Sequence, residues 1–174
     1  MGGTTAKMES LFDLRDFAPA KIRENTFATL ILPRYSFSVT QRQRFLAVSL
    51  ILIHLIISLV HGAAHQAATV RLSMFGNVYV LVVITIAPLV AAGFLFTRRQ
   101  KAATLLLGLS MLGAFLFGFW FHFLSATNDN VAQVHGAWHA TFLWTAIALA
   151  AIEFSGALLA FWWYRVNSYK GAVR

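Results

Sequence analysis

Residues 45–65 read FLAVSLILIHLIISLVHGAAH, a stretch of 21 residues without Asp, Glu, Lys or Arg. A helix of about 20 predominantly apolar residues is long enough to cross the hydrocarbon core of a bilayer. The stretch therefore predicts a transmembrane helix. Its three histidines stand out, because ionisable side chains inside a membrane are costly and usually functional.

Three further apolar segments follow, at about residues 75–96, 102–124 and 134–164. The last is longer than a span requires, so we expect it to tilt or to protrude. The connections between the four segments are short, at residues 66–74, 97–101 and 125–133. Short connections place consecutive helices side by side and antiparallel. The predicted fold is an all-α integral membrane protein with an up-down bundle of four transmembrane helices.

The composition agrees with a membrane protein and excludes several kinds of site. Charged residues make up 11% of the chain and apolar residues 59%, with a mean hydropathy of +0.68. Soluble domains contain about 25% charged residues. The chain has no cysteine. Disulfides, iron–sulfur clusters, thiolate zinc sites and covalently attached c-type haem are therefore excluded.

The net charge of +8 is explained by topology. Basic residues precede the first apolar segment, fill the connection at 97–101 and follow the fourth segment, and only Arg71 falls on the opposite side. Cytoplasmic flanks carry the excess of Lys and Arg in membrane proteins. We therefore expect a multi-pass protein with both termini in the cytoplasm, and no nucleic-acid partner.

The flanking regions divide the chain into an N-terminal arm at 1–44, the transmembrane domain at 45–165 and a cytoplasmic tail at 166–174. The arm is amphipathic, and we expect it to lie on the membrane surface or to dock against another membrane-protein subunit. We expect no cleavable signal peptide, because the first apolar run begins near residue 45, after a long polar stretch.

A six-residue motif occurs twice, as VHGAAH at residues 60–65 and as VHGAWH at residues 134–139. Residues four apart lie on one face of a helix, so each copy can direct two imidazoles at one point. The four histidines of the motif are His61, His65, His135 and His139. The small residues of the motif leave room for close helix approach, or for a flat macrocycle.

Two other side chains are expected at the same end of the bundle. His122 closes the third apolar segment, and Asp129 lies in the connection that follows. In the predicted topology this end faces away from the cytoplasm, and five of the six histidines gather there. His122 could add a ligand, and Asp129 could bind an ion or orient a ligand by a hydrogen bond.

These residues support three hypotheses. The first is a copper, zinc or iron site formed by the motif histidines with His122 or Asp129, in a subunit of a membrane redox complex. All-nitrogen ligation suits copper or zinc, whereas iron normally adds carboxylates. The second is an electron-transfer subunit with haem b, held by one motif histidine from each of two helices. The third is a structural subunit without a cofactor. The sequence leaves open whether the chain is itself an enzyme, such as an oxidoreductase.

Two ionisable residues lie deeper in the membrane. His54 is near the middle of the first segment, and we expect it to bond a backbone carbonyl, Ser110 or a water molecule, or to bind a cofactor. Glu153 is deep in the fourth segment. We expect it to be protonated and hydrogen-bonded, or to belong to a proton path, because a carboxylate is costly there.

Overall fold

The computed structural model describes residues 37–172, and side chains up to Tyr169. This part of the chain is helical and contains no strand. Four helical segments are long and apolar enough to cross a membrane: Gln41–Ala67, Met74–Phe94, Gln100–Leu124 and His139–Tyr169. The predicted fold, an all-α membrane bundle of four helices, is confirmed. The expected amphipathic arm lies largely outside the described residues.

The first span is helix α1, Gln41–Ala67, which begins with a capping box. The side chain of Thr40 accepts a hydrogen bond from the backbone N–H of Gln43, and the Gln43 side chain accepts one from the backbone N–H of Thr40. Such reciprocal bonds satisfy backbone donors that have no partner within the helix. The helix therefore begins four residues before the predicted membrane domain.

The second span is a continuous helix with a change of winding in its middle. It consists of α2, Met74–Tyr79, the π-helical segment η3, Val80–Ile86, and α3, Ala87–Phe94. Pro88 lies in the first turn of α3. Proline has no backbone N–H to donate into the preceding turn, which fits a change from π to α winding at this point.

The third and fourth spans pack against each other more extensively than any other pair of helices. The third consists of α4, Gln100–Phe119, and the π-helical segment η4, Trp120–Leu124, and the fourth is α5, His139–Ala172. A Cβ atom at Gly108 of α4 would lie only 2.9 Å from Cε1 of Phe161 in α5. The missing side chain therefore lets the two helices approach closely.

The helices bury a core of alanines and a few larger apolar side chains, and they expose many other large apolar side chains on their outer faces. Helix α1 packs against α5 and α3, and α3 packs against α4. Many large apolar side chains on the outer faces are exposed, among them Leu59, Phe75, Leu116, Trp144 and Leu158. An apolar surface of this kind belongs in contact with lipid rather than water.

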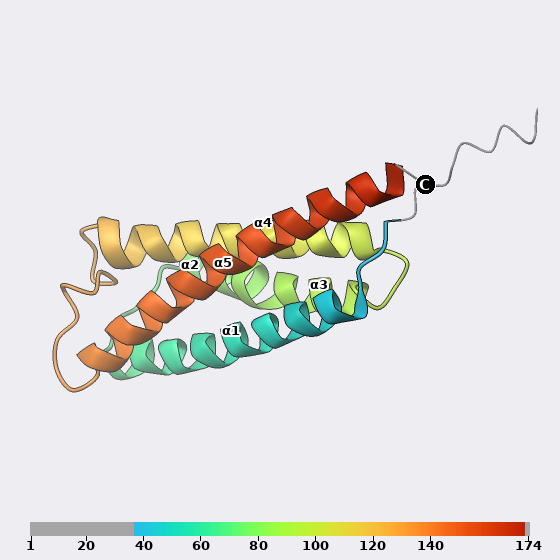
Figure 1. The fold of residues 1–174 in the computed structure, drawn as a ribbon. Helices are drawn as coiled ribbons and strands as arrows, with labels where there is room; N and C mark the ends of the chain where they lie inside the picture. Colours follow the sequence, from blue (N-terminus) through green and yellow to red (C-terminus); the bar gives the residue numbers. More distant parts are fainter. Residues whose placement is uncertain (1–36, 173–174) are drawn as a thin grey trace, which may run out of the picture. The chain divides into compact units, whose positions relative to one another are not determined.

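Figure 1 shows which helix ends lie together. Helix α1 ends, η4 ends and α5 begins at one end of the bundle, where the loop of residues 125–138 connects the third and fourth spans. We call this the histidine end, and the opposite end, where α1 begins and α5 finishes, the basic end. The gathering of these three helix ends follows from the up-down order that the short connections predicted.

Candidate metal centre

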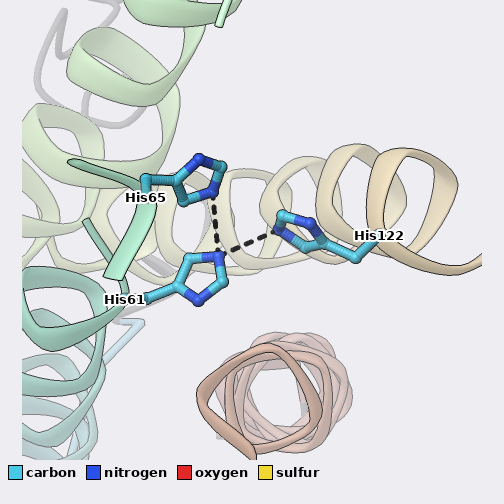
Figure 2. Close-up of side chains that lie close together, drawn as sticks. All are labelled: His61, His65 and His122. Carbon is cyan, nitrogen blue, oxygen red and sulfur yellow. Dashed lines mark hydrogen bonds between the residues drawn. The ribbon is translucent and has the colours of Figure 1, made fainter. Parts of the chain in front are cut away.

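Three imidazoles meet at the histidine end and form the histidine triad, His61, His65 and His122. Nε2 of His61 lies 3.1 Å from Nε2 of His122 and 3.2 Å from Nε2 of His65. Figure 2 shows the three rings turned toward one another, two from α1 and one from η4. His61 and His122 are buried and His65 is partly buried. These are positions from which one ion could be bound by three nitrogens.

Local helical structure explains how the three side chains reach one point. His61 and His65 lie one turn apart on α1 and therefore share a face. His122 lies in the π-helical turn η4, where the backbone N–H of Ser125 bonds to the carbonyl of Trp120 at 2.7 Å. A π turn contains more residues than an α turn, and such turns are frequent at functional sites because they redirect side chains.

The outer nitrogen of each ring faces an acceptor. Nδ1 of His61 lies 2.8 Å from Oγ1 of Thr145, and Thr145 donates its own proton to the carbonyls of Thr141 and Phe142. Nδ1 of His122 lies 3.1 Å from the backbone carbonyl of Asp129. Nδ1 of His65 lies 3.5 Å from the carbonyl of Val70, the longest of the three contacts.

These contacts favour the tautomer with the ring proton on Nδ1, most clearly for His61 and His122. A carbonyl oxygen, or a hydroxyl whose proton is already donated, accepts a hydrogen bond and does not donate one. In a neutral imidazole of this tautomer the other nitrogen, Nε2, has a free lone pair. With all three rings in this form, three lone pairs converge, and a cation placed between the rings would satisfy all of them.

The distances suit a single small ion. Two nitrogens bound to zinc at ~2.0–2.1 Å lie about 3.3 Å apart when the ligand geometry is tetrahedral. The Nε2 separations of 3.1 and 3.2 Å are close to that value. Little rearrangement of the side chains is therefore needed for an ion to bind His61 together with each of its two neighbours.

Asp129 places a carboxylate beside the triad. Its Oδ1 lies 3.3 Å from Nε2 of His65 and 3.4 Å from Nδ1 of His122, and the side chain is buried. Apart from these ion-pair contacts with imidazoles, neither carboxylate oxygen has a hydrogen-bond partner among the described residues. A buried carboxylate that lacks hydrogen bonds is costly. A cation bound at the triad would supply the missing interaction, either by direct ligation or by charge.

Apolar side chains shield the triad on the α5 side. The ring of Phe142 is fully buried, with centroids 4.8 Å from His61, 4.8 Å from His65 and 5.4 Å from His122. Ala64 and Val134 pack in the same cluster. Shielding from water strengthens the attraction between an ion and its ligands.

A cavity of about 550 Å³ opens beside the triad and extends into the bundle. Polar side chains line it near the histidine end, including Gln66, Arg71 and Asn77, and Glu153 borders its deep part. Ligand-binding cavities are typically ~300–1,000 Å³. The cavity therefore gives the triad an open side on which a small molecule or water could approach.

The second copy of the motif does not form the predicted pair. His135 lies exposed in the loop, His139 is the first residue of α5, and the glycine between them, Gly136, has a φ of +92°. The expectation that His135 and His139 share one helix face is wrong, because the helix begins only at His139. Neither belongs to the triad. The motif residue that does pack beside the triad is Val134.

His54 also differs from its expected role. Its Nε2 lies 3.0 Å from Oε1 of Glu153, and both side chains are buried. Ser110, which we expected as a partner, bonds instead to the carbonyl of Leu107. Glu153 is hydrogen-bonded, as one of the two expectations stated, and its protonation stays a prediction. The contact of Thr145 with His61 and the π turn at His122 were not predicted. No residue pattern in the sequence signals either of them.

No protein-family model, curated protein or solved structure matches this chain. The four apolar helices and the buried histidine triad fit a membrane metal-binding protein.

Proposed function

We propose that this protein binds one transition-metal ion in the membrane through His61, His65 and His122, with Asp129 beside the ion. The observation that supports this most strongly is the position of the ring nitrogens. Each Nδ1 faces an oxygen atom, while Nε2 of His61 lies within 3.2 Å of the other two Nε2 atoms. Histidine ligands of metals characteristically donate their other N–H to such an acceptor, which fixes the ring and its tautomer.

The ligand set favours zinc or copper over the other metals that the sequence suggested. Imidazole nitrogen suits both ions, and three histidines with an open fourth position are typical of catalytic zinc. Iron sites usually contain more carboxylate than the single Asp129. With copper bound, we propose a role in electron transfer within a membrane redox complex, since zinc has no redox chemistry.

Haem b is the second candidate, and the cavity is the observation in its favour. It borders the triad, and a Cβ at Gly62 would meet no atom within 4 Å, which leaves space beside α1. A haem, however, separates two axial ligands by its macrocycle. The close approach of three Nε2 atoms is better suited to a single ion. An optical spectrum separates the two candidates, because only haem gives a Soret band.

The test is metal analysis of the purified protein and of matched variants. We expect about one zinc or copper ion per chain and no Soret band. His122→Asn keeps an amide N–H near the position of Nδ1 but removes Nε2, so it should fold and lose the ion. His135→Ala changes an exposed histidine outside the triad and should retain it. A wild-type protein without bound metal, or full occupancy in His122→Asn, would overturn the proposal.

We also propose that both termini lie in the cytoplasm and that other membrane subunits contact the outer faces of the bundle. The exposed Arg98 and Arg99 between α3 and α4 support this orientation, since basic connections remain on the cytoplasmic side. The histidine end, and with it the proposed ion, then faces the opposite compartment.

A further inference from the structure

The pair formed by Glu153 and His54 lies halfway along the bundle, between α5 and α1. The exposed fractions of the two residues are 3% and 2%. Oε1 of Glu153 lies 3.0 Å from Nε2 of His54. An uncompensated charge is costly at this depth. The pair is therefore most stable with no net charge, holding one exchangeable proton between the carboxyl group and the imidazole.

The cavity connects this pair with the histidine triad. Glu153, Ser58 and His122 all line it. A Cβ at Gly118 would lie 3.9 Å from Oε2 of Glu153 and 3.7 Å from Cδ2 of His122, so both side chains border the same space beside this glycine. Oγ of Ser58 is buried without a hydrogen-bond partner among the described residues. Water in the cavity can bond to such groups and carry a proton.

The bundle is closed on the other side of the pair. Toward the basic end, most of the buried side chains are apolar and belong to one core cluster, which includes Ile51, Leu107, Met111 and Ala157. The buried hydroxyl groups there, Ser110 and Thr104, donate to backbone carbonyls of their own helix. The polar path from Glu153 therefore leads through the cavity to the histidine end.

The net charge of the proposed centre favours a second carboxylate nearby. Three neutral imidazoles and one carboxylate, Asp129, leave a divalent ion with a net charge of +1. In a low-dielectric interior this excess charge favours the loss of a proton from a neighbouring acid. The titratable side chains that face Glu153 from the packed helices are His54, Tyr79 and His122. None of them is an acid that would ionise before a carboxyl group.

We propose that Glu153 is the counter-charge of the metal centre. When a divalent ion binds the triad, the proton shared by Glu153 and His54 leaves through the cavity, and the carboxylate remains, bonded to the N–H of neutral His54. No hydrogen bond within the described residues joins Glu153 to the triad, so the coupling acts through charge and not through ligation. This inference rests on the proposed metal site.

The test is the number of protons released when the metal-free protein binds Zn²⁺. Calorimetric titrations at pH 7.5, in buffers with different ionisation enthalpies, give this number. We expect Glu153→Gln to bind one zinc ion but to release about one proton fewer than the wild type. Ser155→Ala, an exposed position on the same helix, should release as many as the wild type. Equal proton release by wild type and Glu153→Gln, at equal zinc stoichiometry, would overturn the inference.

A second measurement needs only the wild-type chain. Infrared difference spectra with ¹³C-labelled glutamate should show a protonated carboxyl band that disappears when zinc binds. The only other glutamates, Glu9 and Glu24, precede the first apolar segment. A spectrum in which zinc binds but no glutamate band is lost would contradict the inference. A wild-type protein that binds no zinc would instead refute the proposed metal site, so the two failures are distinguishable.

Discussion

Replacement of Thr145 by valine tests the hydrogen bond that orients His61. Thr145 Oγ1 accepts from Nδ1 of His61 at 2.8 Å and donates to the carbonyl of Thr141 at 2.6 Å. Valine has nearly the same shape as threonine but no acceptor. In Thr145→Val the ring of His61 must either keep an unpaired N–H in a buried site or move its proton to Nε2. The second choice removes the lone pair that faces the ion.

The magnitude follows from the burial of His61, which is 6% exposed. A buried donor without an acceptor costs about 1–3 kcal/mol. At about 1.4 kcal/mol per factor of ten, the zinc dissociation constant should rise roughly 5- to 150-fold. This range agrees with the ~10–100-fold loss of affinity typical for removal of a hydrogen-bond partner of a metal ligand.

The assay is a competition titration of Zn²⁺ against a chelating dye, with the protein in lipid nanodiscs. Thr145→Ser retains the hydroxyl and should restore most of the affinity. Ser155→Ala is the matched control, because Ser155 makes the same kind of bond to carbonyls of α5 but faces outward. Wild-type zinc affinity in Thr145→Val would refute the tautomer argument for His61.

Three further predictions concern packing, pH and topology. Gly108→Ala should destabilise the bundle by about 1–3 kcal/mol in thermal unfolding, because its Cβ would lie 2.9 Å from the ring of Phe161. Gly62→Ala is the control and should not destabilise the bundle, because its Cβ would meet no atom within 4 Å. Zinc occupancy after equilibrium dialysis should be full at pH 8 and fall steeply below about pH 6, because protons compete with the ion for imidazole nitrogens; occupancy unchanged at pH 5 would contradict this. In the cysteine-free chain, Arg71→Cys should react with an impermeant thiol reagent from outside and Arg98→Cys should not; the reverse pattern would refute the proposed orientation.

The fold was predictable because its main determinant is local. Four apolar stretches of sufficient length and three short connections lead to an antiparallel bundle, and each span was located to within a few residues at most ends. The largest errors were at the two ends of α5, which was predicted at about residues 134–164 and found at His139–Ala172. Apolar residues such as Val134 lengthen a hydropathy segment whether they are helical or, as here, pack from a loop.

The candidate site was only partly predictable. His61 and His65 are neighbours because of helix periodicity, which a sequence displays directly. His122 reaches them through a π turn, and Asp129 through the path of a loop, neither of which has a recognisable sequence signature. His135 was included because its motif repeats that of α1. Two copies of a motif place their histidines in the same way only when both copies are helical, and residues 134–138 precede helix α5.

The most direct test of the proposed metal centre is an X-ray absorption spectrum of the zinc-loaded protein at the zinc edge. The spectrum counts the imidazoles bound to the ion and gives their distances. Ligation by the triad predicts three imidazole nitrogens at ~2.0–2.1 Å and one oxygen ligand at ~2.0–2.2 Å. A wild-type spectrum with an all-oxygen shell, or with one imidazole, would contradict an ion held by His61, His65 and His122.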